Sequence, residues 1–138
     1  NYTVKYGSGR KVPGTYTVTV TMKGDFTGSK TLTFAIRGKQ MAVSKLTALS
    51  KGFKATWKKQ SYITGYQVQY STSSKFTAKT TKHYTINKYT TTYKTVTKLK
   101  AKTKYYVRVR SYKTTKIGGK NYNVYSAWSK AKAVTTKK

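Results

Sequence analysis

The stretch Lys104-Tyr105-Tyr106-Val107-Arg108-Val109-Arg110 has the most informative pattern in the chain, because two kinds of side chain alternate along it. Successive side chains of a β-strand point to opposite faces. One set is therefore predicted to enter a core: Tyr105, Val107 and Val109. The other set is predicted to lie on the outer face: Tyr106, Arg108 and Arg110. The same period of two recurs in much of the chain and predicts an all-β fold.

Upstream, residues 1–37 contain three further alternating runs, which predict a three-stranded antiparallel meander. Turns are expected at Gly7-Ser8-Gly9 and at Lys23–Gly28 between the runs. The meander has one apolar face, made by Tyr2, Val4, Tyr6, Tyr16, Val18, Val20, Met22, Leu32, Phe34 and Ile36. Such a face needs a partner, either strands that precede Asn1 or the chain that follows. Because Asn1 reads as the middle of a strand, we expect a piece of a longer protein.

Residues 38–40 are read as a linker, and residues 41–138 as a second unit with the strand spacing of a β-sandwich. Helical periodicity is nowhere convincing. A polar edge strand is expected within Lys75–Tyr84, with His83 exposed on it, and Asp25 is expected to cap its turn. The other predicted strands lie within 43–48, 53–57, 66–70, 93–99, 105–109 and 124–134.

Charge and composition argue against catalysis. The chain of 138 residues has 30 Lys and Arg, one acid (Asp25), one histidine (His83) and no cysteine, for a net charge of +29. That inventory offers no zinc cage, no carboxylate pair and no spare member for a nucleophilic triad. We therefore expect no enzyme, no metal and no cofactor. No apolar run is long enough to span a membrane.

Residues 41–138 resemble a fibronectin type III domain. Four landmarks occur in order: Trp57 in the second strand, the run Gly65–Tyr70, the pair Leu99 and Tyr105 that resembles a tyrosine corner, and Ser126-Ala127-Trp128-Ser129. The amino-acid sequences of residues 70–76, 104–110 and 125–130 are similar to those of Lys-rich fibronectin type III modules in secreted or cell-surface proteins from Gram-positive bacteria. Residues 1–37 resemble the closing strands of an immunoglobulin-like repeat. The resemblance implies an extracellular spacer or adhesion module without catalytic residues.

The candidate contact residues share the outer face of the predicted sheet, where aromatic rings alternate with cations and amides. They are Tyr106, Arg108, Arg110, Trp128, Lys130, Lys132, Gln67 and Gln69. Such a face could hold a polyanion or a sugar through charge-assisted hydrogen bonds and stacking. The structural alternative is a cation–π ladder around Trp128 that braces the sheet.

Three functions remain open at this point. The first is a non-catalytic surface module for adhesion or presentation, retained on anionic polymers such as teichoic acid or acidic glycans, since a surface this basic attracts polyanions. The second is a spacer, or an assembly subunit that associates with itself through unpaired strands of residues 1–37. The third is a nucleic-acid-binding protein, although no nucleic-acid motif is present.

Overall fold

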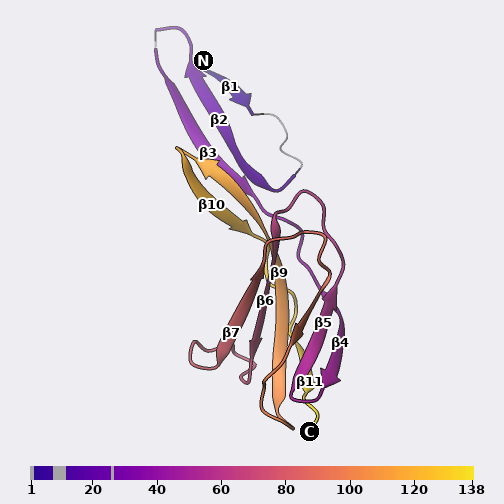
Figure 1. Cartoon of the computed structure of the whole chain (residues 1–138). Coiled ribbons are helices and arrows are strands. Elements are labelled where there is room, and N and C mark those ends of the chain that lie inside the picture. The colour runs from indigo at the N-terminus through magenta and orange to yellow at the C-terminus, as the bar shows by residue number, and fades with distance from the viewer. Residues whose placement is uncertain (1, 8–11, 26) are drawn as a thin grey trace.

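The computed structural model describes residues 2–7, 12–25 and 27–138, and its arrangement is all-β, as predicted (Figure 1). The described residues contain no helix that is long and apolar enough to cross a membrane. The strands are β1 (Tyr2–Tyr6), β2 (Gly14–Met22), β3 (Ser29–Ile36), β4 (Val43–Leu49), β5 (Gly52–Trp57), β6 (Gly65–Ser71), β7 (Thr81–Ile86), β8 (Tyr93–Val96), β9 (Lys104–Ile117), β10 (Lys120–Tyr125) and β11 (Lys132–Thr135).

Strands β4 to β11 form the predicted sandwich of two antiparallel sheets. One sheet has the order β4-β5-β8, and the other has the order β10-β9-β6-β7 with β11 also paired to β9. The inward side chains of both sheets make one core, in which Trp57 and Tyr66 pack with ring centroids 5.4 Å apart. The side chains of β9 alternate between the two faces as the sequence predicts, and Tyr105, Val107 and Val109 are all buried.

Strand β9 organises the second sheet and reaches beyond it. Its 14 residues pair with β6 on one side and with β10 and β11 on the other. Figure 1 shows β9 running from the C-terminal end of the sandwich up to the sheet of β1–β3, where it forms a hairpin with β10. The sequence prediction ended this strand near Val109, so the long extension to Ile117 is a finding of the structure.

A tyrosine corner closes the sandwich where the resemblance placed it. The backbone N–H of Lys100 donates to the Tyr105 hydroxyl oxygen at 3.3 Å, across the turn that leads into β9. A second tyrosine works in a similar way in β6, where the Tyr66 hydroxyl donates to the Tyr89 carbonyl at 2.7 Å. Both rings lie in the core, while their hydroxyls form hydrogen bonds with backbone groups of the adjacent loops. These bonds attach each loop to the sheet.

The polar edge strand is shorter than predicted. Strand β7 begins at Thr81, and residues 73–80 form turns instead of strand. The reason is local hydrogen bonding: Ser73 N–H donates to Ser71 Oγ at 3.1 Å, and Thr81 Oγ1 donates to the Thr77 carbonyl at 2.7 Å. Such side-chain bonds compete with strand pairing. The predicted exposure of His83 on an edge strand is confirmed.

The single strand predicted within 124–134 is divided in two. Strand β10 ends at Tyr125 and β11 begins at Lys132, with an irregular segment at 126–131 between them. Similarly, β8 ends at Val96, and Leu99 packs against the core from the loop that follows. The predicted strands therefore include residues 126–131 and 97–99, which are not strand in the structure.

The predicted meander of β1, β2 and β3 is confirmed as a three-stranded antiparallel sheet. Its register places Val4 opposite Val20 and Val18 opposite Leu32, so the apolar side chains share one face. That face is open, and Leu32 is 48% exposed. The sandwich touches the opposite face, where the hydroxyls of Thr15 and Thr115 are hydrogen-bonded.

Two predicted turns of this sheet fall partly outside the described residues. The Gly7–Gly9 turn includes residues 8 and 9, and the Lys23–Gly28 turn includes residue 26. Asp25 lies in a described turn with Gly24, and its capping role stays a prediction.

Changing Tyr105 to Phe tests the tyrosine corner. The variant loses the hydrogen bond to the Lys100 N–H, so we expect its free energy of unfolding to fall by about 1 kcal/mol. Urea denaturation measures the change. Tyr106→Phe is the matched control, because the hydroxyl of this neighbouring tyrosine has no hydrogen bond to any described residue. Equal stability of the two variants would show that the corner contributes nothing.

Candidate functional site

The outer face of β9 carries a stack in which aromatic rings and guanidinium groups alternate. We call this stack the ladder, and its members in order are Phe76, Arg108, Trp128, Arg110 and Tyr125. The carbon of the Arg108 guanidinium lies 4.0 Å from the Phe76 ring centroid and 4.6 Å from that of Trp128. That of Arg110 lies 4.2 Å from Trp128 and 3.7 Å from Tyr125. Each guanidinium is therefore in contact with two rings.

Two glutamines of β6 orient the guanidinium groups. Pairing of β6 with β9 places Gln67 opposite Arg110 and Gln69 opposite Arg108. The Nε and Nη2 atoms of Arg110 donate to Gln67 Oε1 at 2.9 and 2.6 Å, and Arg108 Nε donates to Gln69 Oε1 at 2.6 Å. The structure thus brings together these four residues with Trp128, as the sequence predicts. Their role in binding stays a prediction.

Serine hydroxyls hold Trp128 in place. The segment 126–131 is not a strand, yet it follows the free edge of β9. Ser126 Oγ accepts from the Ser111 N–H at 3.0 Å, and Ser129 Oγ accepts from the Val109 N–H at 2.9 Å. These side-chain acceptors satisfy backbone donors that a paired strand would otherwise satisfy. Trp128, between the two serines, is directed onto the arginines.

The ladder is positively charged and has no acidic neighbour among the described residues. Burial lowers the pKa of the Arg108 guanidinium from its ordinary value. Burial also lowers the pKa of Arg110, where Tyr125 opposes the effect and the nearby charge of Arg108 adds to it. An arginine remains charged at neutral pH despite such shifts. An anion bound here would supply the counter-charge that both guanidinium groups lack and would offset the mutual repulsion of the two cations.

The other predicted contact residues lie at the margin of the ladder. Tyr106 shares the outer face, and the Nζ atom of Lys104 lies 5.5 Å from its ring centroid. Lys130 is exposed in the irregular segment. The predicted orientation of Lys132 is wrong: it pairs with Val107, whose side chain enters the core, while Ala133 pairs with Tyr106. The irregular segment breaks the alternation counted from Trp128, and directly opposite residues share a face.

Sequence reasoning missed two rungs of the ladder, Phe76 and Tyr125. Phe76 comes from the turn before β7, at a positive φ of 50°, and no alternation could place it. Tyr125 is the last residue of β10, which pairs it with Tyr112. One signal in the sequence could have found Tyr125. This tyrosine lies three residues before Trp128, so two aromatic rings occur close together in a segment expected beside the outward arginines of the neighbouring strand.

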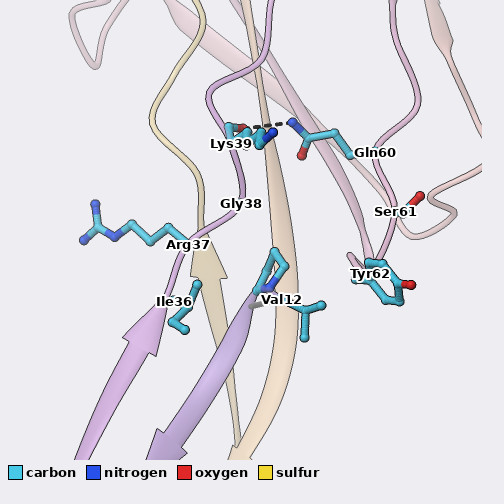
Figure 2. A pocket seen from close by; sticks show the side chains of 9 residues that line it. Val12, Ile36, Arg37, Gly38, Lys39, Gln60, Ser61 and Tyr62 are labelled. Carbon is cyan, nitrogen blue, oxygen red and sulfur yellow. Dashed lines mark hydrogen bonds between the residues drawn. The ribbon is translucent and has the colours of Figure 1, made fainter. Parts of the chain in front are cut away.

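A separate cavity of about 360 Å³ lies at the junction of the meander and the sandwich. Figure 2 shows Gln60 and Tyr62 on one side of the linker and the side chain of Arg37 directed to the other side. The Gln60 amide donates to the Lys39 carbonyl at 2.9 Å. Val12, Pro13 and Ile36 give the lining an apolar part, and none of its residues is acidic. No group of three or more potential metal ligands occurs among the described residues.

Comparisons with known proteins agree on the fold. The family description of the fibronectin type III domain matches residues 39–126. Among solved structures, the crystal structure of the chicken CNTN1 FN1-FN3 domains is similar, with a TM-score of 0.58 and 17% sequence identity. The match covers 92% of this chain and 42% of that one, so the chain spans less than half the length of that structure. At this identity the likeness shows the fold alone. No curated protein sequence matched the chain.

Replacing Trp128 by Ala tests how much the ladder stabilises the sandwich. The variant loses two guanidinium–ring contacts, each worth about 0.5–2 kcal/mol, so we expect the free energy of unfolding to fall by about 1–4 kcal/mol. Urea denaturation is the measurement, because guanidinium chloride screens charge. Tyr122→Ala, which removes an exposed ring of β10, is the control and stays near wild type. An unchanged midpoint for Trp128→Ala contradicts a structural role.

Proposed function

The chain belongs to the fibronectin type III family, and from this membership we infer that it is a non-catalytic extracellular module whose basic surface binds anionic polymers. Domains of this family are typically extracellular and non-enzymatic. Adhesion or presentation at the surface of a Gram-positive bacterium is the setting we propose, with teichoic acid and acidic glycans as the partners. The fold alone does not name a ligand, so the proposal depends on the surface.

One observation carries the proposal: two arginines are held in fixed positions with no carboxylate to neutralise them. Rings and glutamines restrain the guanidinium groups of Arg108 and Arg110. Neither Nη atom of Arg108 donates to an acceptor among the described residues, and the same is true of Arg110 Nη1. A restrained guanidinium loses little conformational entropy when it binds phosphate, sulfate or carboxylate. The ladder is thus both a structural brace and a preorganised set of donors.

The net charge of +29 extends this local site to a long-range attraction. Clefts and faces of one sign attract oppositely charged chains and speed their association. Exposed charges farther apart than about 8 Å are largely screened at physiological salt. Binding that persists at physiological salt must therefore depend on close contacts, which is the property that separates a true site from a generally basic surface.

The test compares two double variants that each remove two positive charges. Lys104→Gln with Lys130→Gln alters the ladder side of the sandwich, and Lys45→Gln with Lys54→Gln alters the opposite sheet. Binding to teichoic acid, heparin, double-stranded DNA and neutral dextran is titrated at several salt concentrations. We expect saturable binding of an anionic polymer by wild type at about 0.15 M salt. The Lys104→Gln, Lys130→Gln variant weakens this binding. Its plot of the logarithm of the binding constant against the logarithm of the salt concentration becomes shallower by about one for each lost contact.

The outcomes separate the candidate functions. Equal weakening by both double variants would show that the charge acts generically. Loss of all saturable binding at physiological salt would leave a spacer. Marked preference for DNA over teichoic acid and heparin would favour the nucleic-acid-binding alternative.

Self-association is a second candidate function, favoured by the open apolar face of the β1–β3 sheet. Tyr2, Met22 and Leu32 on this face are 68%, 48% and 48% exposed. Large exposed apolar patches mark interaction surfaces, and we propose a second copy of the chain as the partner.

Sedimentation velocity at high salt, where the repulsion between copies is screened, should then show a dimer. Leu32→Thr reduces the dimer, and Thr31→Ser on the opposite face is the control; a monomer at all concentrations ends this proposal.

A further inference from the structure

A second cavity lies where the end of β3 meets the end of the ladder. It has a volume of about 410 Å³, and its chemically distinctive lining consists of Ala35, Arg37, Arg110, Asn123, Tyr125 and Trp128. The meander contributes the first two residues, and the sandwich contributes the rest. The cavity therefore exists only because the two units of the chain lie against each other.

Two arginines from different units converge on this cavity. Arg37 is exposed, and Figure 2 shows its side chain on the side of the linker away from Gln60 and Tyr62. Arg110 is restrained by Gln67 and by two rings, and its Nη1 atom has no acceptor among the described residues. None of the residues that line the cavity is acidic. A pair of cations without a counter-charge is suited to a single anionic group between them.

The rest of the lining supplies groups that recognise a sugar. Tyr125 is the last ring of the ladder, and Arg110 covers it from one side. Asn123 beside it accepts from Thr114 Oγ1 through its Oδ1 atom at 2.8 Å, which orients the Nδ2 donors of its amide toward Tyr125. An aromatic ring, an amide and cations together match a sugar ring that carries a charged substituent. A bare inorganic anion uses only the cations.

The linker fixes the position of Arg37 relative to the sandwich. The Gln40 amide donates to the Trp128 carbonyl at 2.7 Å, directly beside the ladder. Gly38 passes so close to β9 that a Cβ atom there would lie 2.8 Å from Ser111 Oγ. The chain between β3 and β4 is thus packed onto the sandwich on both sides of Lys39. A preorganised cavity binds without the cost of ordering its walls.

We propose that this cavity binds an acidic sugar residue of a glycan, with its carboxylate or sulfate held between Arg37 and Arg110. The proposal rests on the proposed function and narrows it, since it names the class of anionic polymer and the place where one unit of that polymer is recognised. The long basic surface then attracts the rest of the glycan, and the cavity selects the sugar.

Isothermal titration calorimetry of the 138-residue chain tests the proposal. The probes are a hyaluronan tetrasaccharide, which carries carboxylates, a heparin tetrasaccharide, which adds sulfates, neutral cellotetraose, and short polyphosphate. Arg37→Gln is compared with Lys39→Gln, which removes one charge two residues away. We expect Arg37→Gln to raise the Kd for at least one acidic tetrasaccharide about tenfold, the loss of one charged hydrogen bond. Lys39→Gln has a much smaller effect.

A second pair of variants blocks the cavity without removing an arginine. Ala35→Glu places a carboxylate beside Arg37, and Thr33→Glu places the same charge two residues earlier on the same face of β3. We expect Ala35→Glu to abolish tetrasaccharide binding and Thr33→Glu to leave most of it. Both positions are exposed, so folding is retained, and circular dichroism checks it.

The possible failures are distinguishable. If acidic tetrasaccharides and long polyanions bind but each variant matches its control, the cavity proposal is wrong and the proposed function stands. If only polyphosphate binds at the cavity, the anion pair is real but sugar recognition is overturned. If wild type binds no anionic polymer at physiological salt, the proposed function fails and this inference fails with it.

Discussion

The hydrogen bonding of strand β9 is the constraint on which the rest of the structure depends. Its backbone pairs with β6 on one side, and on the other with β10, with β11 and with the hydroxyls of Ser126 and Ser129. Pleating then sends alternate side chains to opposite faces. The same strand that fills the core with Tyr105, Val107 and Val109 therefore displays Arg108 and Arg110 outward. Core and candidate site are two faces of one element.

A chain with thirty cations and one acid cannot neutralise its own charge. The ladder shows one physical response, in which aromatic quadrupoles and amide oxygens replace carboxylates as partners of the guanidinium groups. These partners hold the cations in place but leave their charge uncompensated. This is why a brace for the sheet is also suited to bind anions, and why the structural and binding interpretations of the same residues do not exclude each other.

The junction between the meander and the sandwich forms a cavity that neither unit has alone. The β9–β10 hairpin lies against the Thr-rich face of the meander, and the linker is bonded to the sandwich through Gln40 and Gln60. Arg37 belongs to the meander side of this junction and Arg110 to the sandwich. A cavity with cations from both sides follows from that packing. The apolar face of the meander takes no part in this junction and is open.

The fold class, the meander and the outward set of Gln67, Gln69, Arg108 and Arg110 are predictable from the strand pattern, and the sandwich with its tyrosine corner is predictable from the resemblance to the fibronectin type III family. The first group is predictable because the two-residue periodicity of a strand is a local property of the chain. Three-dimensional packing is needed to place Phe76 and Tyr125 in the ladder, and it also sets the orientation of Lys132, the length of β9 and the convergence of Arg37 on Arg110. These depend on turns, on an irregular segment and on contact between distant residues. Alternation carries no information about them, since one unpaired residue reverses every face that follows it.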